Sequence, residues 1–402
     1  MKEKLWTYQY GVLVLANTFN SFGFYMITTI LSTYLTESGI ALSAAGVIVG
    51  MFSVTSLIIR PFCGILSDRA NKVKLLLISF LLAGMGTIGY SIIPRIGPIV
   101  VFRILHGIGF GISSTVLITI AVYFIPEKRM GEGIGYLGIS QVIASAVAPG
   151  LGIAIAEITG YKPVFWLAGG FVLIAVLMVY ICRRGLGEEK TGKVIKEKHA
   201  KQSFCLRDII AVEALGYTLI SGVYSFTNGV ITAFILLFAQ KKGITGISIY
   251  FTVCAAVLFI SKPASGKLVD RKGLAVAVYP ATILSGISMF MLGHAEGIGI
   301  ILLSGIIRSI GQGTAMPALQ TECIRTVGIE RSGVATSTYY LGGDVGQGIG
   351  PMIGGVVVGS MGYEGMFDIC GILLLSMTVV FYYLEKRKRR ESYEKRTGKN
   401  YA

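Results

Sequence analysis

Long apolar stretches recur along nearly the whole chain and are separated by short polar segments. Each stretch is near the length of about 20 residues that a helix needs to cross a bilayer. We therefore predict an all-α integral membrane protein with twelve spans. The predicted spans are residues 8–34, 41–63, 75–94, 98–123, 133–156, 163–182, 208–238, 246–265, 274–293, 297–320, 333–357 and 363–384.

The composition agrees with a membrane chain. Hydrophobic residues make up 53% and charged residues 14%, whereas roughly 25% of an ordinary soluble domain is charged. The 53 glycines suit close helix packing in lipid. The first apolar stretch is too long for a signal-peptide core and no small-residue cleavage site follows it, so we expect it to remain as a span.

Lysine and arginine gather in alternate polar segments. If both termini are cytoplasmic, the cytoplasmic segments hold 28 of the 36 Lys and Arg residues, the outer segments hold four and the spans hold four. Cytoplasmic loops collect these cations, so we predict cytoplasmic termini in a plasma membrane, expected to be a bacterial inner membrane. Attraction to anionic lipid accounts for the net charge of +15, and no nucleic-acid partner is expected.

Several kinds of chemistry lack support in the sequence. The six cysteines show no metal-ligand spacing, and two of the three histidines lie in predicted loops. No acids cluster, no nucleophile stands beside a base, and no glycine loop for nucleotide phosphates appears. We therefore expect no enzyme activity, no cofactor and no metal site.

An internal repeat divides the chain into two related halves. Residues 61–69, PFCGILSDR, match residues 263–271, PASGKLVDR, after a shift of 202 positions, and the same shift places Pro149 on Pro351. A charged segment without apolar periodicity separates the halves. We predict a six-helix bundle over 1–182, a cytoplasmic linker over 183–207, a second bundle over 208–385 and a basic tail over 386–402. The tail is expected to anchor the topology, with a partner-binding arm as the alternative.

These motifs carry a family resemblance. The loop after the second predicted span resembles the loop signature of the major facilitator superfamily, and the repeat supplies a second copy; the matching residues are Gly64, Leu66, Asp68, Arg69 and Lys72, then Gly266, Leu268, Asp270 and Arg271. The fourth span resembles the family's buried-arginine motif at Arg103, Gly107 and Gly109. The glycine and proline motif of the family's antiporter branch is resembled by Pro149, Gly150 and Gly152, and more fully by Gly350, Pro351, Gly354 and Gly355. AlaProGly at 148–150 departs from the GlyPro of that motif, so the fifth span is weaker support for antiport.

The resemblance implies two pseudo-symmetric bundles that alternate access to a central cavity, and a polar latch between them at the inner face. We expect Asp68 to interact there with the positive end of a helix or with a cation of the other half. The alternative is a basic turn with one compensating acid. Arg60 and Lys262, at equivalent repeat positions, are either latch residues or cations whose side chains extend to the interface.

Charged residues inside spans are costly unless they are paired or face a wet cavity. Counted along their helices, Arg308 and Asp344 fall near the same depth, so we expect them to form a pair that couples transport to protons. A static buried salt bridge is the alternative. Arg103 is the other coupling candidate, because the resemblance implies a role for this arginine in proton movement.

Polar and aromatic residues mark one side of several spans. The resemblance places such residues on the cavity, and the candidates for substrate contact are Asn17, Asn20, Phe24, His106, Gln141, Tyr217, Tyr224, Asn228 and Gln347. Hydrogen bonding between helices is the alternative for each, and His106 alternatively packs as a hydrogen-bonded residue.

The sequence therefore predicts a monomeric, proton-coupled efflux transporter of small organic molecules, such as drug-like compounds or secreted metallophores, with protons and the lipid bilayer as its other partners. A proton-linked importer of a sugar, organic acid or other nutrient is the alternative.

Overall fold

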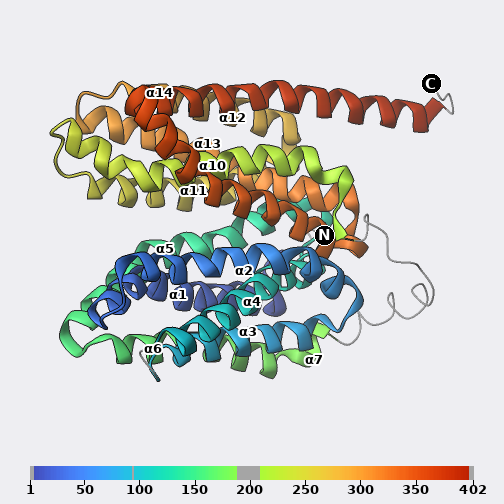
Figure 1. Cartoon of the computed structure of the whole chain (residues 1–402). Helices are drawn as coiled ribbons and strands as arrows, with labels where there is room; N and C mark the ends of the chain where they lie inside the picture. The colour runs from blue at the N-terminus through green and yellow to red at the C-terminus, as the bar shows by residue number, and fades with distance from the viewer. Residues whose placement is uncertain (1–3, 93–94, 188–208, 398–402) are drawn as a thin grey trace. The chain divides into compact units, whose positions relative to one another are not determined.

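The computed structural model describes residues 4–92, 95–187 and 209–397, and every regular element in them is helical. The long helices are α1 (Tyr8–Glu37), α2 (Leu42–Arg69), α3 (Lys72–Gly89), α4 (Ile96–Ala121), α5 (Met130–Thr159), α6 (Tyr161–Ile181), α10 (Leu215–Lys241), α11 (Ser248–Lys272), α12 (Leu274–Gly293), α13 (Ile298–Val327) and α14 (Ser332–Thr397) (Figure 1). Short helical turns are α7 (Arg183–Gly187), η1 (Glu127–Arg129), η2 (Val212–Ala214) and η3 (Ile329–Arg331).

The last long helix comprises two of the predicted spans. At Gly362 the backbone leaves helical geometry, with φ 73° and ψ −178°, so α14 divides into two helices. Each of the twelve predicted spans therefore has a helix. In the described part of the chain, ten helical segments are long and apolar enough to cross a membrane, with both parts of α14 counted as one. The predicted all-α membrane fold is confirmed.

Short turns join neighbouring helices because capping residues stand at the junctions. Between α2 and α3, the Asn71 side chain accepts a hydrogen bond of 3.0 Å from the Lys74 backbone N–H, which satisfies one free donor of the first turn. Gly160 and Gly273 have φ of +83° and +87°, a conformation that glycine adopts without strain. They end α5 and α11, so the next helix begins at once.

The helices form two compact units. Unit 1 comprises Met1–Val212 and Ile324–Leu341, and unit 2 comprises Glu213–Cys323 and Gly342–Ala402. Unit 1 thus includes the end of α13 and the first turns of α14. Within it, α3 packs on α4 and α6, and α1 packs on α5 and α6. Within unit 2, α11 packs on α12.

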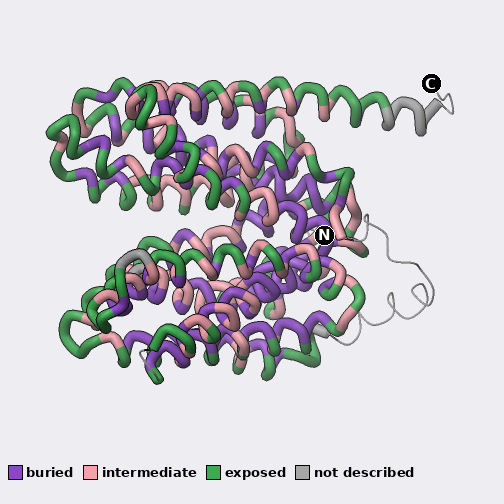
Figure 2. The backbone as a smooth tube through the Cα atoms, in the orientation of Figure 1, coloured by how far each residue is buried: buried purple, intermediate pink, exposed green. Residues whose placement is uncertain are grey.

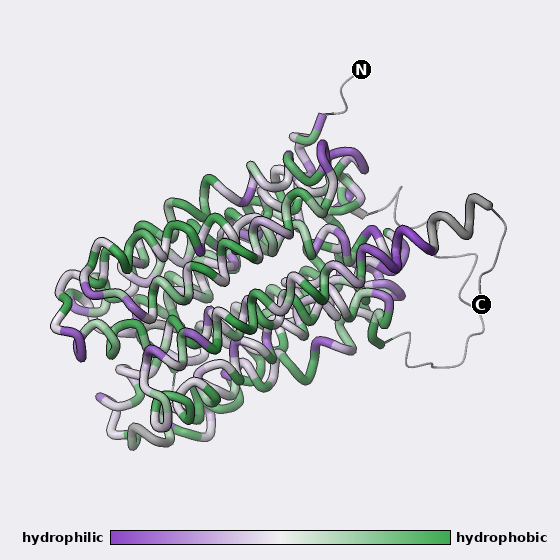
Figure 3. Tube along the Cα trace, turned by 90° about the horizontal axis from the view of Figure 1, so that it is seen from above, coloured by the Kyte–Doolittle hydropathy of each residue, from purple (hydrophilic) through white to green (hydrophobic). Residues whose placement is uncertain are grey.

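Burial within each unit follows helix faces (Figure 2). Unit 1 has a core of apolar residues contributed by α1, α3, α4, α5 and α6. Large apolar side chains such as Ile158, 83% exposed, lie on the surface, as expected where lipid is the solvent. Hydrophilic residues concentrate at the helix ends and along the C-terminal part of α14 (Figure 3).

Candidate functional site: a helix-end contact and two buried arginines

Asp68, in the last turn of α2, binds the first turn of α14. Its Oδ1 accepts a hydrogen bond of 2.9 Å from the Gly333 backbone N–H, and its Oδ2 accepts one of 3.0 Å from that of Val334. The first N–H groups of a helix lack partners within the helix, and a carboxylate there also interacts favourably with the helix dipole. Asp68 thus meets the positive end of a helix.

Two glycines allow the backbones to approach at this point. A Cβ atom on Gly64 would lie 2.9 Å from the Val334 Cα and 3.1 Å from the Ser337 Cβ. A Cβ atom on Gly333 would lie 2.6 Å from the Asp68 Oδ1. Such distances are shorter than van der Waals contact, so a larger residue at either position would separate the two helices.

The contact continues toward the middle of α2. Arg60 is buried, its guanidinium carbon lies 4.5 Å from the centre of the Tyr340 ring, and its backbone oxygen accepts a hydrogen bond from the Ser337 hydroxyl. The guanidinium also donates to the Ser114 hydroxyl of α4 at 3.1 Å. We call the set Arg60, Gly64 and Asp68 with Gly333, Val334, Ser337 and Tyr340 the helix-end contact.

The cations of the loop differ in their surroundings. Arg69 is exposed, whereas Lys72 is buried and its Nζ lies 5.6 Å from the centre of the Tyr123 ring. In the second copy of the signature, Gly266 is buried, Asp270 is half-buried and Arg271 is exposed.

Arg103 of α4 is buried without a carboxylate partner among the described residues. It is 1% exposed, its Nη2 donates to the Val49 backbone oxygen at 2.8 Å, and its guanidinium carbon lies 4.8 Å from the centre of the Phe52 ring. Its Nε and Nη1 have no hydrogen-bond partner in the described part of the chain. This side chain is therefore a buried cation with unused donors.

Next to Arg103, aromatic rings from three helices surround His106. The Phe24 ring centre lies 4.5 Å from that of Phe110 and 4.9 Å from that of Phe52. His106 lies 5.1 Å from Phe52, and its Nδ1 is 3.3 Å from the Tyr90 hydroxyl. The structure thus brings two sequence candidates, Phe24 and His106, into one cluster.

The other candidates on this half lie elsewhere in unit 1. Asn17 donates to the Leu137 backbone oxygen of α5 at 3.2 Å, which is the interhelical hydrogen bond considered as its alternative. Asn20 is buried on α1, and Gln141 is half-buried on α5.

In unit 2, Arg308 does not form the expected ion pair with Asp344. Its guanidinium donates to the Gln312 Oε1 at 2.7 Å, to the Thr227 hydroxyl at 3.1 Å and to the Tyr224 backbone oxygen at 3.5 Å. Asp344 is half-buried on α14. The pair was expected because both residues lie at a similar depth on neighbouring helices. The Arg308 side chain instead binds groups of α10 and the next turn of its own helix, α13.

Of the three candidates for substrate contact on α10, two are buried and one forms a hydrogen bond with a candidate on α14. Tyr217 and Tyr224 are buried, whereas the Asn228 amide donates to the Gln347 Oε1 of α14 at 3.2 Å. Two candidates from different helices are therefore joined directly.

The glycine and proline motif of α14 packs closely against α10. A Cβ atom on Gly350 would run into the Phe226 backbone oxygen, and one on Gly354 would lie 3.0 Å from the Phe234 ring. Gly355 has ordinary contact distances, and Gly150 of α5 has no such neighbour within 4 Å. Pro149 and Pro351 both lie inside their helices.

Two buried acids were missed by the sequence analysis. Glu322 of α13 forms an ion pair with Lys388 of the C-terminal part of α14, and Glu132 of α5 pairs with Arg129 at 2.7 Å. Both acids lie just outside the predicted spans, where charged residues are expected. Hydropathy therefore did not indicate that they would be buried. The Lys388 contact joins the start of the basic segment to α13 of the same unit.

Comparison with known proteins gives the family. The family model of the Major Facilitator Superfamily matches residues 13–347 and 282–400. The chain belongs to the major facilitator superfamily. It is therefore a secondary transporter of the plasma membrane that handles small molecules, rather than an enzyme.

Curated members of the superfamily resemble the chain over most of its length. It is 26% identical to the multi-drug resistance efflux pump PmrA of Streptococcus pneumoniae, over 80% of this chain and 81% of that protein. It is 23% identical to the multidrug resistance protein MdtG of Escherichia fergusonii, over 92% of each. It is 21% identical to the staphylopine export protein of Staphylococcus aureus, over 89% and 92%.

Solved structures agree on the superfamily fold. The human organic anion transporter MFSD10 matches with a TM-score of 0.76 and 14% identity, over 92% of this chain and 98% of that one. A bacterial homologue of the iron transporter ferroportin, in an outward-facing state, matches with a TM-score of 0.77 and 13% identity, over 94% and 100%.

Proposed function

We propose that this protein exports small organic molecules in exchange for protons, by alternating access, and that the helix-end contact is its reversible latch. The observation that carries the proposal is the pair of hydrogen bonds from the α14 backbone to Asp68. A latch must hold one state and then release it. Hydrogen bonds to a charged group contribute about 1.5–3 kcal/mol each, which is strong enough to bias a two-state equilibrium and weak enough to break.

The outward direction is supported by the relatives. Two of those compared are named for multidrug resistance and one for staphylopine export. The rings of Phe24, Phe52 and Phe110 in unit 1 offer apolar contact to an amphipathic organic molecule. We assign substrate contact to this cluster and to the Asn228–Gln347 pair.

Proton coupling requires a group that gains and loses a proton. Arginine stays charged under all physiological conditions, so Arg103 and Arg308 can bias a carboxyl group but cannot carry the proton. Asp344 is half-buried in the span segment of α14. We assign the proton to Asp344 and an electrostatic role to Arg103 and Arg308.

The distribution of Lys and Arg supports cytoplasmic termini. We place the helix-end contact at the cytoplasmic side on this basis and propose that a monomer is the transporting unit.

The test is substrate-dependent proton flux in vesicles of purified protein. Efflux by antiport predicts that substrate and protons move in opposite directions and that an uncoupler stops uphill transport. Movement of both in the same direction would support the alternative, a proton-linked importer, and contradict the proposal.

A further inference from the structure

A pocket in unit 1 lies where α1 and α5 end and α6 begins. Its volume is about 630 Å³, and small-molecule sites are typically about 300–1,000 Å³. The lining residues all belong to unit 1. They are Ile30, Thr33 and Glu37 of α1, Ile153, Ala156 and Glu157 of α5, and Gly160 and Tyr161 at the junction with α6.

The pocket combines an apolar wall with an acidic rim. Ile30 is buried in the apolar core of unit 1, and Ala156 packs against that core. Glu37 and Glu157 are exposed, and the lining contains no lysine, arginine or histidine. Ligand sites in proteins combine apolar walls with a few polar groups that fix the ligand. This pocket therefore suits a molecule that is both apolar and positively charged.

The two carboxylates have no cationic partner among the described residues. Neither Glu37 nor Glu157 forms an ion pair in the part of the chain that the structure describes. Lys162 directly follows Tyr161 and is exposed, but it does not line the pocket. A cation that binds here therefore does not have to displace a lysine or an arginine.

Tyr161 is held in place beside Glu37. Its hydroxyl interacts with the Glu37 carboxylate, and its ring centre lies 5.4 Å from that of Tyr34. Tyr34 is buried and donates a hydrogen bond of 3.1 Å to the Tyr90 backbone oxygen. An aromatic ring attracts an organic cation, and a ring that is fixed in advance loses little entropy on binding.

Size and ligand number favour an organic cation over a metal ion. Two carboxylates line the pocket. In the described part of the chain, no group of three or more His, Cys, Asp or Glu side chains could hold a metal. The volume of the pocket also exceeds the space that a single ion fills.

We propose that this pocket binds an amphipathic organic cation, with its charge at Glu37 and Glu157 and its apolar part against Ile30. The site is separate from the aromatic cluster of Phe24 and Phe52, because neither of these residues lines the pocket. The proposal depends neither on the direction of transport nor on proton coupling.

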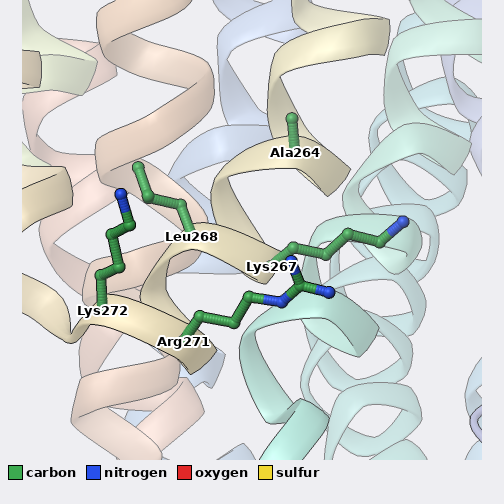
Figure 4. A pocket seen from close by; sticks show the side chains of 5 residues that line it. All are labelled: Ala264, Lys267, Leu268, Arg271 and Lys272. Atoms are coloured by element: carbon green, nitrogen blue, oxygen red, sulfur yellow. The ribbon is translucent and has the colours of Figure 1, made fainter.

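Another pocket of the protein has the opposite charge. It is lined by Ala264, Lys267, Leu268, Arg271 and Lys272 of α11, and the side chains of Lys267 and Arg271 extend in the same direction (Figure 4). None of these lining residues is an acid, so an organic cation has no carboxylate to bind there. Charge thus distinguishes the two pockets.

The test measures binding of tetraphenylphosphonium to the purified full-length protein in detergent, by isothermal titration calorimetry. Tetraphenylborate, which has the same shape and the opposite charge, is the comparison. A carboxylate close to a cation in water contributes about a fivefold gain in affinity. We therefore expect tetraphenylphosphonium to bind about 25-fold more weakly to the double variant Glu37→Gln with Glu157→Gln. Tetraphenylborate should bind to this variant no more weakly than to the wild type.

The matched control is the double variant Glu213→Gln with Glu296→Gln, which removes the same charge from exposed residues of unit 2. It should bind tetraphenylphosphonium like the wild type. The single variant Glu157→Gln, about fivefold weaker, keeps Glu37 beside Tyr161 and serves if the double variant does not fold. The same losses are expected when Phe24→Ala is also present, because Phe24 does not line the pocket.

Three results would overturn the proposal. Equal binding of tetraphenylphosphonium by the pocket variants and the control would remove the site. Equal weakening of tetraphenylborate would show that the substitutions act on the fold and not through charge. A difference that disappears when Phe24→Ala is present would assign the binding to the aromatic cluster instead.

Discussion

Single residues of this transporter act through backbone groups as much as through other side chains. Asp68 binds two peptide N–H groups, and Arg103 donates to a peptide oxygen. In both cases the hydrogen-bond partner is a backbone group, which a sequence comparison of side chains does not reveal. A substitution of Asp68 therefore acts through the first turn of α14. A substitution of Arg103 acts through the backbone of α2 at Val49.

Replacing Asp68 by Asn should slow transport at least tenfold, with normal expression. The amide keeps one acceptor oxygen but loses the charge and one of the two hydrogen bonds to α14, so the latched state is less stable. Transport rates in vesicles are the measurement. Asp368→Asn, which alters a more exposed carboxyl beside His294, should transport normally. Wild-type rates for Asp68→Asn would show that the latch has no role.

Replacing Asp344 by Asn should abolish uphill transport driven by a pH gradient while leaving downhill substrate exchange. The amide cannot carry a proton, but the substrate contacts assigned to unit 1 are unchanged. Both rates are measured in the same vesicles, with Glu364→Gln, an exposed acid paired with Lys242, as the control. Uphill transport by Asp344→Asn would refute the assignment of the proton to this residue.

Helices in this protein approach each other most closely where glycine faces glycine or backbone. The span segment of α14 packs on α10 through Gly346 and Gly350, and its first turn packs on α2 through Gly333 and Gly64. In lipid, such contacts supply packing that the hydrophobic effect cannot. The motif resembling that of the antiporter branch is thus also a packing surface.

Gly350→Ala should lower the Tm of the purified protein, by an amount equivalent to about 1–3 kcal/mol of overpacking. The added Cβ would run into the Phe226 backbone oxygen. Gly348 lies two residues before Gly350 and therefore on another side of α14, where an added Cβ atom would have no neighbour within 4 Å. Gly348→Ala should leave the Tm unchanged or raise it, because alanine favours helix. Equal Tm values for the two variants would contradict this account of the α10–α14 contact.

At the scale of the whole molecule, the architecture is that of the superfamily, and a buried arginine lies on α4 of unit 1 and on α13 of unit 2. Arg103 in unit 1 and Arg308 in unit 2 are both buried near aromatic or hydroxyl groups. The uphill export that we propose requires an energy source linked to the movement of substrate.

Cells that express the protein should therefore accumulate less of an exported amphipathic compound, and an uncoupler should restore accumulation to the level of cells without it. Proton antiport loses its driving force when the gradient collapses. The Asp344→Asn variant is the matched control and should accumulate the compound with or without uncoupler. Efflux that continues in the uncoupler would exclude proton coupling.

Much of the fold follows from the sequence, because the cost of burying polar groups in lipid fixes span length and because the repeat shows two related halves. The twelve helices and the family were predicted from these signals and are confirmed. The candidate site was predicted less fully. Phe24 and His106 do meet, but Asn17 is used for helix packing and Arg308 binds Gln312 in place of Asp344.

The sequence by itself determined which segments cross the membrane, since hydropathy is a property of consecutive residues. Only the tertiary structure decided which way each side chain points and what it meets. Asp68 reaches the first turn of α14, and Glu322 binds Lys388 of a segment 66 positions along the chain. The physical reason is that a helix fixes depth through its rise, whereas contacts depend on its rotation and on the neighbours against which it packs.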